Sequence, residues 1–188
     1  DRKDIQLPSN YFFPKNAPEA ARLDWKELKT FYGIPSAVPL PDTTAIDLIH
    51  GYYACVSYID AQIGRVLDAL EDYGLSEKTI VVLLGDHGWF LGEHGFWTKQ
   101  SNLIEGPHAP LIIKVPWKQE EVKTKSLVEF VDVYPTLCEL AGLIPPMHVQ
   151  GKSFAPLFDN PDQPWKQSVF YRNFDGETIL TETHAYTE

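Results

Sequence analysis

The sequence predicts an α/β fold: a fragment of a mostly parallel sheet flanked by helices. Three patterns support this class. Residues 80–84 are consecutive apolar residues rich in β-branched side chains, as in a strand buried on both faces of a parallel sheet. Residues 110–115 predict a second buried strand, which ends at Pro116. Over residues 46–70, apolar residues recur at spacings of three and four, which predicts one apolar face of a long helix.

The long helix is expected to begin at Thr44 or at the residue before it. Thr44 and Asp47 have the spacing of a capping box. Gly74 can adopt the left-handed conformation that commonly closes a helix. Upstream, residues 1–42 are rich in proline and aromatic residues, and only a short helix around residues 19–32 is expected there. This approach segment could line a substrate pocket, but a packed surface loop is the expected default.

A second helix is predicted over residues 132–141. Asp132 is well placed as its N-cap and is therefore expected to be structural rather than catalytic. Pro135 fits the first turn, where a missing N–H costs nothing, and Gly142 closes the helix.

The two prolines at positions 145 and 146 mark a boundary. Beyond them, residues 168–173 and 177–188 predict strands of a small antiparallel sheet. The expected organisation is therefore a main α/β region over residues 1–145 and the start of a C-terminal subdomain over residues 146–188.

Composition limits the classes of function. The 188 residues carry a net charge of −10 and no basic run, which argues against nucleic acid as a partner. No apolar run reaches membrane-spanning length, so no membrane partner is expected. Cys55 and Cys138 lie in apolar helical contexts, where core packing is the expected role and no disulfide framework is indicated.

The chemistry is concentrated in residues 79–102, where the predicted strand ends in Asp86-His87-Gly88 and a loop follows. Ligands of open α/β sheets bind beyond the carboxyl ends of strands. A carboxylate suits Ca²⁺ or Mg²⁺, whereas an imidazole favours softer metals unless the other ligands decide otherwise. Lys99, later in the loop, adds a cation suited to an anionic ligand. Taken alone, the pattern is explained equally well if Asp86 is a turn residue and His87 is a surface residue.

The wider pattern favours the metal site. The segment GDHGWFLGEHGFWTKQSN resembles the C-terminal metal motif of the sulfatase family, within the alkaline-phosphatase-like superfamily, and is similar to its iduronate sulfatase type. YYACVSYIDAQIGRVLDALEDYGLSEKTIVV resembles the helix before this strand. HAPLIIKVP and LVEFVDVYPTLCELAG resemble the strand and the helix after it, so the resemblance covers roughly residues 44–158.

The resemblance implies a role for each motif residue. Asp86 and His87 would be two ligands of a Ca²⁺ ion, or of Mg²⁺ in some members. Lys99 would be the catalytic residue that contacts the sulfate. His94 would contact substrate or hydrogen-bond a metal ligand, although it could equally fix the turn together with Glu93. His108 is expected to be structural.

Two tryptophans of the motif could also contribute. Trp89 and Trp97 could form an apolar wall for a sugar ring, but aromatic residues this dense are more often part of a core. Both interpretations remain open at the level of sequence.

Other sulfatase features are absent from this sequence. The family carries a paired-Asp metal motif and a Cys/Ser-x-Pro-Ser-Arg signature, whose Cys or Ser becomes formylglycine, and neither occurs here. The chain is therefore expected to be the C-terminal part of a larger enzyme, inactive when isolated. The expected substrate is a sulfated saccharide, in a secreted, periplasmic or lysosomal protein. The alternatives are a phosphate or phosphonate ester hydrolase of the same superfamily, and a non-catalytic lobe.

Overall fold

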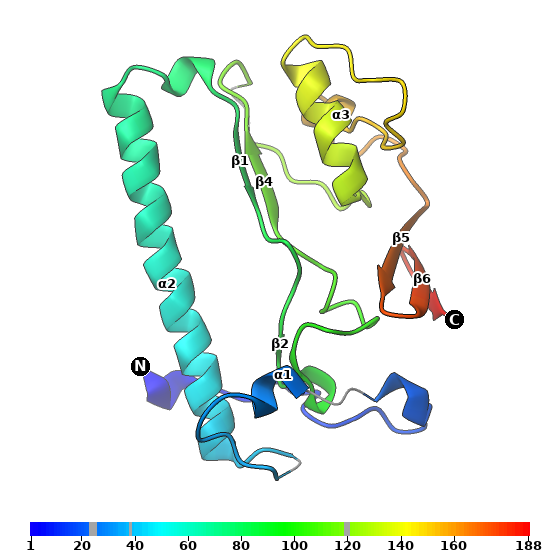
Figure 1. Cartoon of the computed structure of the whole chain (residues 1–188). Helices are drawn as coiled ribbons and strands as arrows, with labels where there is room; N and C mark the ends of the chain where they lie inside the picture. The colour runs from blue at the N-terminus through cyan, green and yellow to red at the C-terminus, as the bar shows by residue number, and fades with distance from the viewer. Residues whose placement is uncertain (23–25, 38, 119–120) are drawn as a thin grey trace. The chain divides into compact units, whose positions relative to one another are not determined.

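The computed structural model describes residues 1–22, 26–37, 39–118 and 121–188 (Figure 1). The chain forms two compact units: residues 1–78 with 83–112, and residues 79–82 with 113–188. The chain passes between the units within two strands, β1 (Val81–Leu84) and β4 (Leu111–Lys114), which pair in a two-stranded sheet. None of the helices in the described ranges is both long and apolar enough to cross a membrane.

The long helix of the first unit is α2 (Asp42–Asp72), which runs uninterrupted in Figure 1. It begins two residues earlier than Thr44, so the expected capping box is wrong. The reason is Pro41, whose carbonyl accepts hydrogen bonds from the N–H groups of Thr44 and Ala45 and closes the first turn without a side-chain cap. The expected end is confirmed: Gly74 has φ +65°, and its N–H donates to the carbonyl of Glu71.

The core of the first unit packs against the first turns of α2. Its buried members come from the approach segment, from α2 and from the motif loop: Tyr11, Leu28, Leu40, Ala45, Ile49 and Trp97. Beyond Ile49, the apolar face of α2 is exposed; Val56 and Val66 are 53% and 69% accessible. The expectation of a helix that flanks the sheet is therefore not met for this part of α2 within the described residues. Cys55 lies on this exposed part of α2, whereas Cys138 is buried as expected.

The strand expected after α2 is present as β1, but its burial differs from the expectation. Leu83 and Leu84 are 40% and 43% exposed, and within the described chain β1 pairs only with β4. The apolar side chains at the end of β1 therefore keep part of their surface in water. The α/β class holds, but the parallel sheet is not shown.

The approach segment contains only short helical turns. They are η1 (Arg2–Asp4), η2 (Glu19–Ala21) and α1 (Lys26–Lys29). The expected helix over residues 19–32 is thus present as two short pieces, and residues 23–25 between them lie outside the described residues.

The motif loop after β1 contains a small hairpin. Strands β2 (Phe90–Leu91) and β3 (Trp97–Thr98) pair antiparallel, with Phe90 opposite Thr98. The turn η4 (Glu93–Gly95) connects them, and η3 (Ser76–Lys78) lies between α2 and β1. Phe90 is fully buried and packs edge-on against Phe96. The hairpin therefore anchors the loop on which the motif residues lie.

The helix of the second unit is α3 (Phe130–Leu140). Its N-cap is Glu129, so the expectation that Asp132 is the N-cap is wrong by three residues. Asp132 instead occupies the third helical position and completes a capping box by accepting a hydrogen bond from the N–H of Glu129 at 2.9 Å. Its expected structural role therefore stands. Pro135 lies one turn deeper than expected, and Gly142 closes the helix at φ +71°.

The small antiparallel sheet predicted at the C-terminal end is confirmed. Strands β5 (Ser168–Asn173), β6 (Gly176–Thr181) and β7 (Ala185–Thr187) form a meander in that order. The turn η5 (Ala155–Phe158) precedes it. Val169 of β5 and Thr178 of β6 are buried, whereas Phe170 of β5 is exposed, so one face of this sheet is covered.

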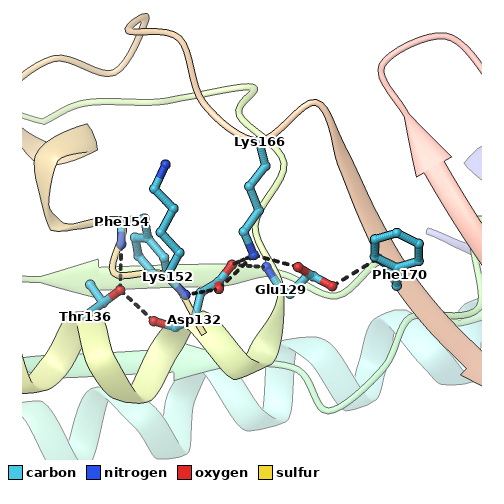
Figure 2. Close-up of polar contacts among 7 residues, drawn as sticks. All are labelled: Glu129, Asp132, Thr136, Lys152, Phe154, Lys166 and Phe170. Atoms are coloured by element: carbon cyan, nitrogen blue, oxygen red, sulfur yellow. Dashed lines mark hydrogen bonds and ion pairs between the residues drawn. The ribbon is translucent and has the colours of Figure 1, made fainter. Parts of the chain in front are cut away.

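A buried polar network holds α3 to the segment that follows it (Figure 2). Asp132 is fully buried and accepts hydrogen bonds from the N–H of Lys152 at 2.7 Å and from Nζ of Lys166 at 2.6 Å. The same ammonium donates to Glu129 at 2.6 Å. Thr136 donates to the carbonyl of Asp132 and accepts from the N–H of Phe154 at 2.9 Å. Each buried charge is thus paired, as burial requires.

The network sets the pKa of Lys166. Burial alone would lower this pKa, but the hydrogen bonds and charges of Asp132 and Glu129 together outweigh it and raise the pKa above the ordinary value of 10.5. The folded state therefore retains the Lys166 proton more strongly than the unfolded state does. This stabilisation is fully present below about pH 10.5 and is lost as the pH rises through the folded pKa.

Replacement of Lys166 by methionine is expected to lower the free energy of unfolding by roughly 3 kcal/mol near neutral pH, because the carboxylates of Asp132 and Glu129 lose their cation. The difference between wild type and variant should shrink above about pH 10.5. Urea unfolding between pH 7 and pH 11 measures both effects. Lys123→Met, at an exposed position, is the control. If the difference in unfolding free energy between wild type and variant stays constant across this pH range, the raised pKa of Lys166 does not contribute to stability.

Candidate functional site

The turn that carries Asp86 and His87 is fixed by a close approach of backbone to backbone. Gly85 donates to the carbonyl of Pro110 at 3.0 Å, and Gly88 donates to the carbonyl of Gly106 at 2.7 Å. A Cβ atom at position 88 would overlap the carbonyl oxygens of Glu105 and His108. Only glycine fits at this position, so the spacing of Asp-His-Gly has a physical cause.

Asp86 and His87 present their donor atoms toward one another. Nε2 of His87 lies 3.5 Å from Oδ1 of Asp86, longer than a hydrogen bond. Nδ1 of His87 lies 2.7 Å from the carbonyl oxygen of Gly88. If Nδ1 carries the proton and donates there, the lone pair of Nε2 is free for a metal. Asp86 is 88% exposed and His87 33% exposed, so both can be reached from solvent.

The donor atoms of this pair suit part of a metal site. A carboxylate oxygen and an imidazole nitrogen 3.5 Å apart are compatible with two ligands of one cation. Within the described ranges, no group of three or more His, Cys, Asp or Glu side chains could hold a metal ion. The pair therefore fits as part of a site, and a hard cation would need further oxygen ligands.

Trp89 connects the ends of the motif. Its ring stacks with His87 at a centroid distance of 6.1 Å and with Tyr52 of α2 at 6.0 Å. Nζ of Lys99 lies 5.4 Å from the centre of the same ring, within the range of a cation–π interaction. The structure thus brings His87 and Lys99 to one aromatic ring, although they are far apart along the loop.

Lys99 also forms an ion pair that the sequence did not indicate. Its Nζ lies 3.1 Å from Oε1 of Glu27 in α1, and the two side chains are 30% and 31% exposed. The other carboxylate oxygen of Glu27 is buried and has no hydrogen-bond partner among the described residues. No sequence pattern pointed to Glu27, because the contact joins residues 72 positions apart.

His94 has a different environment. It adopts a left-handed conformation with φ +57°, and its N–H donates to the carbonyl of Asn10 at 2.7 Å. Nε2 of His94 lies 3.0 Å from Oε1 of Glu105, a second partner that the sequence did not indicate. Glu93 accepts a hydrogen bond from the N–H of Leu91 at 2.7 Å. The described contacts therefore tie Glu93 and His94 to the loop.

The two motif tryptophans differ in burial. Trp97 is 2% exposed and packs edge-on against Tyr11 in the core of the first unit, so it is part of the core rather than an apolar wall for a sugar ring. Trp89 lies at the site, between α2 and the side chains of His87 and Lys99. His108 donates its backbone N–H to the carbonyl of Ile104 at 3.0 Å.

Comparison with known proteins places this chain in a family. The family described as Sulfatase matches residues 7–143. The chain is 31% identical to mouse (Mus musculus) iduronate 2-sulfatase, over 79% of this chain and 34% of that protein. The structure described as BT1596, a 2-O GAG sulfatase, has a TM-score of 0.75 and 23% identity, over 98% of this chain and 42% of that one.

A third similarity concerns the fold alone. The phosphonate monoester hydrolase of Silicibacter pomeroyi has a TM-score of 0.73 at 23% identity, over 84% of this chain and 35% of that one. The chain spans about a third of the length of the curated relatives it matches. The family match extends over most of the chain and includes the whole motif loop. The chain therefore belongs to the sulfatase family.

Proposed function

We propose that this chain works as part of a longer metal-dependent sulfuric ester hydrolase that acts on sulfated saccharides. The observation that carries the proposal is the grouping of Asp86, His87 and Lys99 around the turn after β1, in a chain of the sulfatase family. We also propose the division into a catalytic region over residues 1–145 and a C-terminal subdomain from residue 146. A secreted, periplasmic or lysosomal location belongs to the same proposal.

Asp86 and His87 are proposed as two ligands of a Ca²⁺ ion, with Mg²⁺ as the alternative. The exposure of Asp86 and the 3.5 Å separation of the donor atoms support this role. When bound, such an ion supplies Lewis-acid chemistry and orients the sulfate oxygens. The remaining ligands and the formylglycine nucleophile are expected from parts of the protein outside this chain.

Lys99 is proposed to contact the sulfate group. An ammonium has three donors; one is directed to Glu27 and the others remain available for an anion. As the bond between sulfur and the ester oxygen breaks, negative charge grows on the oxygens, and a fixed cation at this place stabilises it. His94 is proposed to contact substrate, although its pairing with Glu105 also suits a role in holding the loop.

Saccharide sulfates are favoured as substrates for two reasons. The relatives described above are an iduronate 2-sulfatase and a 2-O GAG sulfatase. Trp89 also offers a partly exposed aromatic ring beside Lys99, and such a ring can pack against a sugar. The phosphonate monoester hydrolase shares the fold, so phosphonate or phosphate ester hydrolysis is the second candidate.

The full-length protein is expected to hydrolyse an aryl sulfate and a 2-O-sulfated uronic-acid saccharide in the presence of Ca²⁺. The measurement is release of inorganic sulfate, with the matching aryl phosphate and phosphonate as parallel substrates. Turnover of the phosphorus esters without any sulfate ester turnover would establish the second candidate instead. Absence of turnover on all three classes would leave a non-catalytic lobe.

Replacement of Lys99 by alanine in the full-length protein is expected to lower kcat by about a hundredfold, comparable with removal of one preorganised donor to a developing charge. Lys125→Ala, at an exposed position in the second unit, is the control and should keep wild-type rates. Equal kcat values for Lys99→Ala and wild type would remove Lys99 from the mechanism.

The 188-residue chain alone is expected to bind Ca²⁺ poorly and to show no sulfatase turnover. Two ligands are too few for a cation that takes six to eight oxygen ligands, and the sequence contains no formylglycine signature. Calorimetric titration with Ca²⁺ and the same sulfate-release assay test this. Turnover by the purified chain would overturn the idea that the active site is divided.

A further inference from the structure

The approach segment contributes one charged side chain to the motif loop. Leu28 of α1 is 6% exposed and belongs to the core that includes Trp97 of β3. Helix α1 lies against β3, and Lys99 follows β3 directly. Burial of Leu28 therefore holds its neighbour Glu27 beside Lys99, where their charged atoms are 3.1 Å apart.

The ammonium of Lys99 is thus held between two partners from different elements. Glu27 contacts it from α1, and the ring of Trp89 lies 5.4 Å away in the loop after β1. The same ring stacks on His87. A long lysine side chain loses much conformational freedom on being fixed, so two contacts are needed to offset that cost.

The state of the second carboxylate oxygen argues against a purely structural role for Glu27. Oε2 of Glu27 is buried and accepts no hydrogen bond from the described residues. A buried acceptor without a donor is costly. Anchoring α1 alone does not require a side chain with such an acceptor. The attraction to Lys99 is the interaction that accounts for a carboxylate at this position.

We propose that Glu27 is a positioning residue: it fixes the ammonium of Lys99 for the sulfate group of the substrate. The inference rests on the proposed sulfatase function. Because Glu27 occupies one donor of the ammonium, the remaining donors point away from it and toward an incoming anion. Its negative charge weakens the binding of a sulfate ester in the ground state, while the fixed geometry favours the transition state.

This balance predicts a particular kinetic pattern for Glu27→Gln in the full-length protein. Glutamine keeps the shape and one acceptor oxygen but removes the charge. We expect kcat to fall about tenfold, the effect of losing one charge-assisted hydrogen bond, while KM for the sulfate ester stays equal or decreases. Damage to the fold would instead raise KM and lower the melting temperature. Glu27→Asp, which keeps the carboxylate, should recover part of the loss.

Glu19→Gln is the matched control. Glu19 pairs with Arg22 at 2.7 Å in the same approach segment, but at an exposed position. Its replacement should leave kcat and KM unchanged. A Glu27→Gln protein with wild-type kcat would overturn the inference.

A second measurement separates this inference from the proposed function. Acetylation of Lys99 by acetic anhydride, followed by peptide mass spectrometry, reports how firmly its ammonium is held without any need for turnover. Labelling should rise about tenfold in Glu27→Gln and stay unchanged in Glu19→Gln. If the full-length protein cleaves no sulfate ester, the proposed function fails, and raised labelling still supports Glu27 as the residue that positions Lys99. Unchanged labelling overturns the inference in either case.

Discussion

The close contact between Gly88 and Gly106 is the constraint on which the motif loop depends. Gly88 donates to the carbonyl of Gly106 at 2.7 Å, and a Cβ atom at position 106 would lie 2.8 Å from the carbonyl oxygens of both Lys99 and Ser101. Because the two glycines have no side chains, the turn after β1 and the later part of the loop can pack backbone against backbone. Asp86 and His87 are thereby tied to the backbone that carries Lys99. A side chain at either glycine would separate the two halves of the motif.

Local patterns predicted the elements that depend on neighbouring residues. The strand at β1, the long helix α2, its closure at Gly74 and the C-terminal antiparallel sheet all follow from spacing and turn chemistry. The starts of the helices were less predictable. Pro41 closes the first turn of α2 through its carbonyl, and Glu129 caps α3 with Asp132 in support. Several capping arrangements can satisfy the N–H groups that lack partners in the first turn of a helix, so a sequence pattern does not select among them.

The partners of the site residues could not be predicted from the sequence. Lys99 meets Glu27, and His94 meets Glu105, through contacts set by packing of separate segments. The periodicity of α2 correctly indicated an apolar face, yet that face is largely exposed beyond Ile49. Periodicity shows that a face is suited to burial, but it cannot name what covers it. The curated relatives are about three times as long as this chain.

The network around Asp132 has a consequence for how the second unit folds. Lys166 is 34 residues from Asp132 along the chain, and Lys152 is 20 residues away. The carboxylate is therefore compensated only after the intervening segment has returned to α3. Until then it remains in water, and the first turn of α3 lacks most of its tertiary support. Closing such loops lowers the conformational entropy of the chain before the contacts form and offset that cost. Helix α3 and the segment after it should accordingly order together, as one cooperative step rather than in sequence.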